Sequence, residues 1–176
     1  MTVEQEKTII GLKYAIQMEI DGKEYYLKAS EKSSQQMGKK LLQSLAAEED
    51  IHRRKFEQIY NAIQNKQDWP GRYYQPDGGK ALRTIFARAT EKLATTARAS
   101  ATELESVQGA IDMEVKSYDY YKERSSDASY AAEKDFYEAV ATQERQHQLV
   151  LLDYYEYLRD PAAWFVKTEH PSLDGG

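Results

Sequence analysis

Apolar side chains recur in steps of three and four residues over four long segments of the chain, a spacing that predicts amphipathic helices. Two of these segments lie within residues 3–66 and two within residues 100–159. Polar turn regions near residues 33–36 and 125–127 separate the segments of each pair, and Pro70 and Pro161 follow the ends of the second and fourth segments. Because proline cannot continue a helix, we expect two helical hairpins with these limits.

Residues 67–99, between the hairpins, have a different pattern. Prolines and glycines over residues 70–79 predict a loop, and residues 82–89 predict a short helix. The stretch is long enough to run the length of a bundle, so we expect an all-α four-helix bundle of two antiparallel hairpins joined by a long crossover. Residues 1–176 would form one domain, with a C-terminal tail over residues 160–176 that packs partly through Trp164 and Phe165.

One set of metal-ligand-type residues occurs twice, once in each hairpin. Positions 114, 144 and 147 lie 95 after positions 19, 49 and 52, and they hold the same three residue types. The two sets are Glu19, Glu49 and His52, and Glu114, Glu144 and His147. Other residues repeat at the same offset: Ala15, Met18, Tyr26 and Trp69 match Ala110, Met113, Tyr121 and Trp164. A duplicated two-helix unit is the simplest interpretation.

The spacing also predicts where the six residues meet. Residue 34, midway between positions 19 and 49, and residue 129, midway between 114 and 144, both fall in turn regions. Each hairpin therefore places its single glutamate level with its Glu-x-x-His, about 22 Å from the turn at about 1.5 Å per residue. All six residues occupy apolar-face positions where Leu or Ile would otherwise stand, so we expect them to converge in the core.

Four carboxylates in a core need a countercharge. Burying one carboxylate costs several kcal/mol even after relaxation, and four at one level would also repel one another. Two divalent cations would balance four carboxylates beside two neutral imidazoles. Mixed oxygen and nitrogen donors favour iron or manganese, with zinc as an alternative and calcium or magnesium disfavoured. The sequence therefore predicts a centre of two metal ions, with iron and manganese as the favoured metals.

Several other polar residues lie near these positions or stand apart from them. Tyr26 and Tyr121 lie two turns after Glu19 and Glu114 on the same faces, so they could hydrogen-bond a ligand carboxylate, carry an electron or merely fill the core. His170 has no repeat partner, and we interpret it as a surface residue. Four residues fall off the apolar faces and are expected on solvated faces: Glu24, Glu48, Asp119 and Gln143.

Composition narrows the class of protein. The 176 residues are 41% hydrophobic and 30% charged, as in an ordinary soluble domain, and the net charge of −5 argues against nucleic acid or an anionic membrane as partner. The absence of cysteine excludes disulfides and thiolate metal sites. No apolar run approaches the roughly 20 residues that span a bilayer, and the polar N-terminus is no signal peptide, so a cytoplasmic location is expected.

At the repeated motifs the sequence resembles the ferritin-like di-iron proteins, and most closely the rubrerythrin family. The resemblance implies that Glu19, Glu49 and His52 serve one iron, that Glu114, Glu144 and His147 serve the other, and that Glu49 and Glu144 bridge. Rubrerythrins tend to carry an additional glutamate one turn after the ligand of the third helix. Ser117 stands there in this chain, which implies a more symmetric site of four glutamates and two histidines.

The resemblance also implies a function. A redox enzyme that reacts with hydrogen peroxide or dioxygen is expected, with peroxide removal favoured. Electrons would come from an external donor such as a rubredoxin-like protein or a flavoprotein reductase, since the chain has no cysteine for a rubredoxin site, and a homodimer is expected. The alternatives are a ferroxidase or iron-storage protein, which lacks support because no fifth helix of the storage ferritins is evident, and a structural two-metal bundle.

Overall fold

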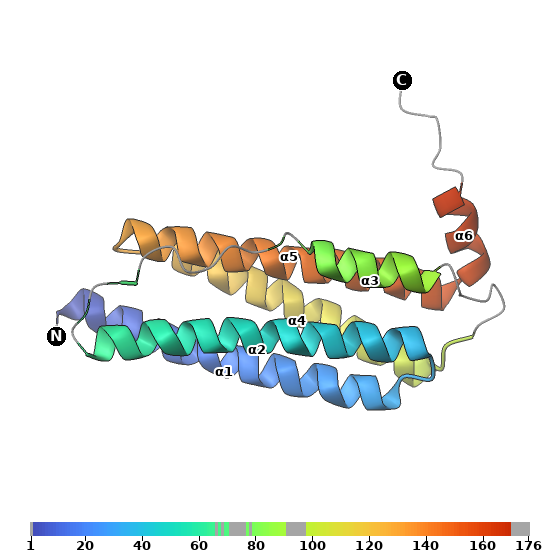
Figure 1. Cartoon of the computed structure of the whole chain (residues 1–176), viewed down its shortest axis with the longest axis horizontal. Helices are drawn as coiled ribbons and strands as arrows, with labels where there is room; N and C mark the ends of the chain where they lie inside the picture. Colours follow the sequence, from blue (N-terminus) through green and yellow to red (C-terminus); the bar gives the residue numbers. More distant parts are fainter. Residues whose placement is uncertain are drawn as a thin grey trace, which may run out of the picture.

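The computed structural model describes residues 2–65, 67, 69–70, 77, 79–90 and 98–169, and this part of the chain is almost entirely helical. Its helices are α1 (Val3–Lys32), α2 (Gln36–Gln64), α3 (Lys80–Thr90), α4 (Ala101–Ser126), α5 (Ala131–Arg159) and α6 (Pro161–Glu169). Four of them are long and form one bundle (Figure 1). The all-α bundle that the apolar spacing predicts is confirmed.

The long helices pair as two hairpins, as predicted. Helix α1 packs along α2, and α4 packs along α5; contacts of α1 with α4 and of α2 with α5 join the hairpins. Residues 34 and 129 lie in the two hairpin turns. The turn after α1 is tied to the other hairpin, because the hydroxyls of Ser33 and Ser34 each donate a 2.7 Å hydrogen bond to the buried carboxylate of Glu103.

Side chains at the helix starts explain where these elements begin. The Thr2 hydroxyl accepts a hydrogen bond from the Gln5 backbone N–H, and the Gln5 side chain accepts one from the Thr2 backbone N–H, which together form a capping box. At α4 the Ser100 hydroxyl accepts from the Glu103 N–H. Each contact satisfies a backbone donor that the first turn of a helix leaves without a partner.

Helix α3 is the described helix of the crossover. Helix α3 lies against α2 and α5 and buries Leu82 and Phe86 (Figure 1). The short helix predicted over residues 82–89 is therefore confirmed and extends slightly further at both ends. Most of the predicted loop and residues 91–97 lie outside the described residues.

Two hydrophobic clusters fill the bundle, one on each side of a polar level at mid-height. Along α2, Leu45 belongs to one cluster and Phe56 to the other, and Glu49 and His52 lie between them. In each of the other three long helices the ligand-type residues also lie between residues of one cluster and residues of the other. The bundle thus has no continuous apolar core, and the polar level separates its two halves.

The segment after α5 is a finding beyond the sequence pattern, which predicts only a tail. Arg159 ends α5 as expected, but Pro161 then begins α6 instead of an irregular stretch. Proline suits the first position of a helix, where its missing N–H is not needed, and the Asp160 carboxylate accepts from the Ala163 N–H. The first part of the predicted tail is therefore a short helix.

Helix α6 is anchored by aromatic packing, as predicted for Trp164 and Phe165. Trp164 is buried, with its ring centroid 5.7 Å from those of both Phe86 and Tyr157, and its indole N–H donates a 2.8 Å hydrogen bond to Asp153. Phe165 is partly buried against the same cluster. The crossover and the C-terminal helix therefore share one aromatic contact at the end of the bundle.

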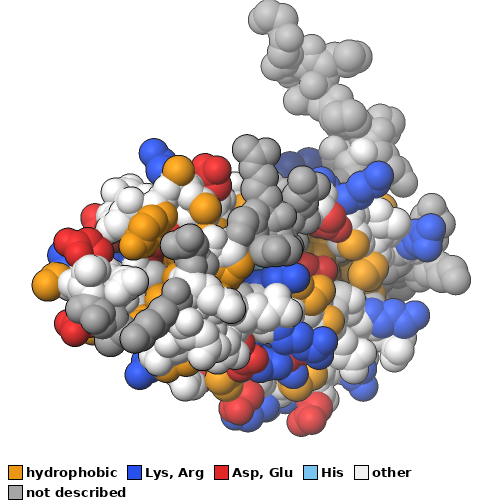
Figure 2. Space-filling model, turned by 60° about the vertical axis from the view of Figure 1, so that its left-hand side comes forward, with side chains coloured by type: hydrophobic (Ala, Val, Ile, Leu, Met, Phe, Trp, Pro, Cys, Tyr) orange, Lys and Arg blue, Asp and Glu red, His pale blue; other side chains and the backbone are white. Residues whose placement is uncertain are grey.

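The surface is mixed in charge. Lysine and arginine side chains alternate with aspartate and glutamate on the face that Figure 2 shows, with apolar side chains between them. Within the described residues no helix has both the length and the apolar character to cross a bilayer.

Replacing Trp164 with alanine should destabilise the whole bundle, because the change removes a buried aromatic side chain that joins α6 to α3 and α5. We expect a loss of about 3 kcal/mol in the free energy of unfolding, measured by urea denaturation. Val166→Ala, on the exposed face of the same helix, is the matched control and should change it by less than about 0.5 kcal/mol. Equal, small effects of both variants would show that α6 does not pack as described.

Candidate metal centre

The polar level at mid-height is formed by the six residues that the repeat predicts. Glu19 comes from α1, Glu114 from α4, and α2 and α5 each supply a Glu-x-x-His. All six side chains are buried, and both histidines are fully inaccessible. Because Glu-x-x-His spans about one turn, each helix directs its carboxylate and its imidazole into the same space.

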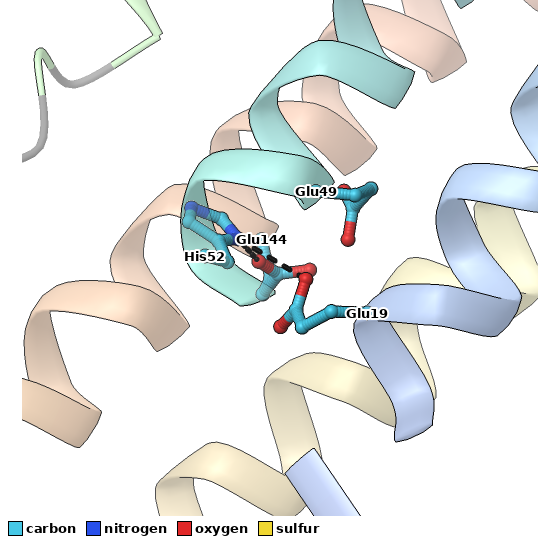
Figure 3. Close-up of side chains that lie close together, drawn as sticks. All are labelled: Glu19, Glu49, His52 and Glu144. Carbon is cyan, nitrogen blue, oxygen red and sulfur yellow. Dashed lines mark ion pairs between the residues drawn. The ribbon is translucent and has the colours of Figure 1, made fainter. Parts of the chain in front are cut away.

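Each histidine lies between a glutamate of its own hairpin and one of the other hairpin. His52 Nδ1 is 3.4 Å from Glu19 Oε2 and 3.0 Å from Glu144 Oε1, and Figure 3 shows these side chains converging from α1, α2 and α5. His147 Nδ1 is 3.4 Å from Glu114 Oε1 and 3.2 Å from Glu49 Oε1. The centre therefore depends on both hairpins, which follow the same pattern.

The ligand-type atoms fall into two overlapping groups. One group holds Glu19, Glu49, His52 and Glu144, and the other holds Glu114, His147 and again Glu49 and Glu144; within each, the donor atoms lie within 4.8 Å of one another. The two imidazole rings stack with centroids 5.7 Å apart. Since Glu49 and Glu144 belong to both groups, they are placed to contact two ions at once.

Two buried tyrosines donate hydrogen bonds to the outer carboxylates, across the interface between α1 and α4. The Tyr26 hydroxyl donates to Glu114 Oε1, and the Tyr121 hydroxyl donates to Glu19 Oε1. Burial and the nearby carboxylates raise the pKa of both phenols well above the usual range, so each hydroxyl keeps its proton and acts as a donor. Each hairpin thus orients a carboxylate of the other.

The electrostatics show how badly the carboxylates fit a core without cations. Burial raises the pKa of Glu49 and Glu144 well above the usual range, and neighbouring carboxylates add to the effect. Burial also opposes the charged form of His52, but the carboxylates of Glu19, Glu49 and Glu48 together outweigh it and raise the pKa of His52 to about 9. Burial acts on Glu19 too, yet His52 beside it lowers the pKa of Glu19.

Hydrogen bonding provides a direct test of whether the residues fit a metal centre. One oxygen of each glutamate (Glu19 Oε2, Glu49 Oε1, Glu114 Oε2 and Glu144 Oε1) and both ring nitrogens of His147 form no hydrogen bond with a described residue, even where an imidazole nitrogen lies within 3.4 Å of the oxygen. A buried acceptor without a partner costs free energy, and a carboxylate costs more than a neutral group. Two divalent cations bound by these atoms would remove that cost, so the donor set fits them.

One glycine leaves space beside a shared carboxylate. Gly22 is buried one turn after Glu19, and a Cβ there would lie 3.2 Å from Glu49 Oε2, with the three nearest atoms all belonging to Glu49. The equivalent residue of the repeat is Ser117, which stands where rubrerythrins tend to carry an additional glutamate. A glycine inside a long helix was the only sequence signal for this space.

The four residues expected on solvated faces differ in how far they are buried. Glu24 and Asp119 are exposed, as predicted, and Glu48 is half-buried. The prediction for Gln143 was wrong, because Gln143 is buried, its amide donates a 3.2 Å hydrogen bond to Glu48, and it also interacts with Asp77 of the crossover. The apolar pattern of α5 alone cannot show that residues of the crossover pack against the face of α5 that carries Gln143. His170 lies outside the described residues.

Comparisons with known proteins agree with this geometry. A family model described as Rubrerythrin matches residues 11–155, which contain all six ligand-type residues. No curated protein and no solved structure matches the chain. The family match and the buried cluster together indicate a two-metal site of rubrerythrin type.

The metal-free protein should lose stability as pH rises from about 5 to about 9. Groups whose pKa is raised by folding bind more protons in the folded state, so Glu49, Glu144 and His52 stabilise the fold at low pH and lose this contribution as pH rises. The lowered pKa of Glu19 acts only below about 4.5 and lies outside this window.

Thermal unfolding of chelator-treated protein at three pH values between 5.5 and 8.5 measures the effect, with and without manganous ion as a ligand that air does not readily oxidise. Because metal binding requires deprotonated ligands, the rise in Tm produced by the metal should grow with pH. A metal-free protein that becomes more stable from pH 5.5 to pH 8.5 would contradict the assigned charges.

Proposed function

Because the chain belongs to the rubrerythrin family, we propose that it is a di-iron oxidoreductase that reduces hydrogen peroxide, or dioxygen, with electrons from an external donor. The observation that carries this proposal is the pair of overlapping four-residue groups, in which the four buried carboxylates and the His147 imidazole keep ligand-type atoms without hydrogen bonds to described residues. When bound, two ferrous ions would supply two electrons for cleavage of the O–O bond. The protein would bind the ions, orient their ligands and exclude water.

The chain's own residues account for the binding and the orientation. Glu49 and Glu144 belong to both groups, so each would help to hold both ions. Tyr26 and Tyr121 hold Glu114 and Glu19 by hydrogen bonds from outside, which fixes the carboxylate orientation, as such outer contacts do in other metal sites. The two hydrophobic clusters above and below exclude bulk water from the reaction.

Iron storage in a hollow assembly is the second candidate, and α6 is the observation that favours it. Helix α6 continues from the end of α5 and turns away from the bundle (Figure 1), so the chain does have a helix after the fourth long one. Size-exclusion chromatography distinguishes the candidates, because the peroxide reductase is expected as a homodimer and a storage protein as a large assembly.

The proposed reaction predicts a fast phase when anaerobic ferrous protein is mixed with hydrogen peroxide in a stopped-flow spectrometer. Oxidation should be at least about tenfold faster than that of the same concentration of free ferrous ion, since this corresponds to only about 1.4 kcal/mol of barrier lowering. Glu144→Ala removes a carboxylate common to both groups and should abolish both the binding of two ions and the fast phase.

Two controls make this result specific. Glu24→Ala removes an exposed glutamate from α1 and should leave metal content and rate unchanged. Tyr26→Phe removes only a hydrogen bond to Glu114 and should still bind two ions. If Glu144→Ala retained two metals, the ligand assignment would be wrong. If the normal protein reacted no faster than free iron, the peroxide reaction would be excluded.

A further inference from the structure

The tyrosines beside the metal centre continue outward in two symmetric branches. Tyr121 contacts Tyr120, with ring centroids 5.5 Å apart, and Tyr26 contacts Tyr25, with centroids 6.4 Å apart. The outer members also match. Tyr120 donates a 3.0 Å hydrogen bond to the Gly11 carbonyl, and Tyr25 donates a 2.8 Å hydrogen bond to that of Ser106, which is the residue 95 positions after Gly11.

The symmetry ends at the next position. Tyr14 packs on Tyr120 with centroids 4.9 Å apart, and Tyr14 is 57% exposed. The repeat mate of Tyr14 is Gly109, and a Cβ there would lie 2.2 Å from the Tyr25 hydroxyl oxygen. No side chain can therefore occupy the equivalent position on the other branch without displacing Tyr25. An unbroken series of tyrosine rings connects the centre to an exposed tyrosine on the Tyr121 branch.

We propose that Tyr121, Tyr120 and Tyr14 form a route for single electrons between an external one-electron donor and the metal centre, with Tyr14 as the point of entry. The inference rests on the proposed function and assigns the place where the electrons of that reaction enter. Tyrosine suits the task because its ring is oxidisable once its phenolic proton has an acceptor. The rings in this series are in contact, so no step has to cross a gap filled by aliphatic side chains.

The protons and electrons of the route balance. With hydrogen peroxide as the oxidant, Tyr121 gives one electron to the centre and its phenolic proton to the carboxylate oxygen of Glu19, to which it already donates a hydrogen bond. Tyr14 then supplies an electron to Tyr121 through the ring of Tyr120. The Tyr120 hydroxyl keeps its proton, with which it donates a hydrogen bond to the Gly11 carbonyl. Glu19 returns the proton to Tyr121.

Tyr14 is restored at the surface. Being exposed, Tyr14 releases its phenolic proton to water when it loses an electron, and it regains both from water and the one-electron donor. Each passage moves one electron from the donor to the centre without net proton transfer along the route. Two passages would return to the centre the two electrons that it gives to one peroxide, which becomes two water molecules by taking up two protons from solvent.

The test uses the ferrous protein mixed with hydrogen peroxide in excess over the two electrons that the iron supplies, in the absence of any reductant, with a nitroso spin trap present and peptide mass mapping of the adducts. Without a donor, the radical should remain on Tyr14, so the trap should label Tyr14, and the label is expressed per iron oxidised. Tyr121→Phe should lower the Tyr14 label about tenfold. Tyr26→Phe is the matched control, because it also removes one hydrogen bond to a ligand carboxylate but interrupts only the other branch, and it should retain the label.

The outcomes separate the two proposals. Fast iron oxidation with no label on Tyr14, or an equal label in the normal and Tyr121→Phe proteins, would overturn the route and leave the proposed function standing. Iron oxidation no faster than that of free iron would overturn both. A Tyr14→Phe variant adds a readout from the donor side, since its oxidised centre should be reduced about tenfold more slowly by a protein-sized one-electron donor.

Discussion

The structure depends on the burial of four carboxylates at one level of a helical bundle. Each of the glutamates is at most 4% exposed, and in this position each has an oxygen atom that no described residue hydrogen-bonds. Desolvation alone costs several kcal/mol for one such group, and mutual repulsion adds to the cost. A bundle this size has only a few kcal/mol of stability to lose, so the six polar residues are intelligible only as a binding site for cations.

The same constraint explains the layered core. The ligand-type residues interrupt the apolar face of every long helix, so the hydrophobic clusters lie above and below them rather than forming one core. Packing in each cluster keeps the four helices in register, and the register brings the carboxylates together. Binding of metal should therefore stabilise the fold as well as equip it for chemistry, in line with the linkage between ligand binding and stability.

Duplication of a two-helix unit gives the centre its pseudo-twofold symmetry, and the departures from that symmetry are informative. The hydrogen bond that Tyr26 donates to Glu114 of the other hairpin has its counterpart in the one that Tyr121 donates to Glu19. Gly22 is equivalent to Ser117 in the repeat, and Tyr14 is equivalent to Gly109. The two hairpins therefore differ both beside a shared carboxylate and at the surface. A symmetric binding site is thus combined with two dissimilar tyrosine branches, of which one ends at the exposed Tyr14.

Most of the centre could be predicted because it obeys two periodicities, the helical turn and the offset of 95, both visible in the sequence. The spacing could not show that each histidine lies near a glutamate of the opposite hairpin, since that depends on how the hairpins dock. Gln143 was misplaced because the crossover covers it, and α6 was missed because Pro161 ends one helix and also begins the next. Each of these failures involves a contact between segments that the local pattern does not encode.

The most direct measurement is the anomalous scattering of iron in a crystal of the iron-loaded protein. Two peaks per chain are predicted at mid-height of the bundle, one beside His52 Nδ1 and the other beside His147 Nδ1. They should lie about 3.5–4 Å apart, the usual spacing of two-metal sites, with Glu49 and Glu144 reaching both. A single peak, or iron bound only at the surface carboxylates, would contradict the assignment of the buried glutamates and histidines to a two-metal centre.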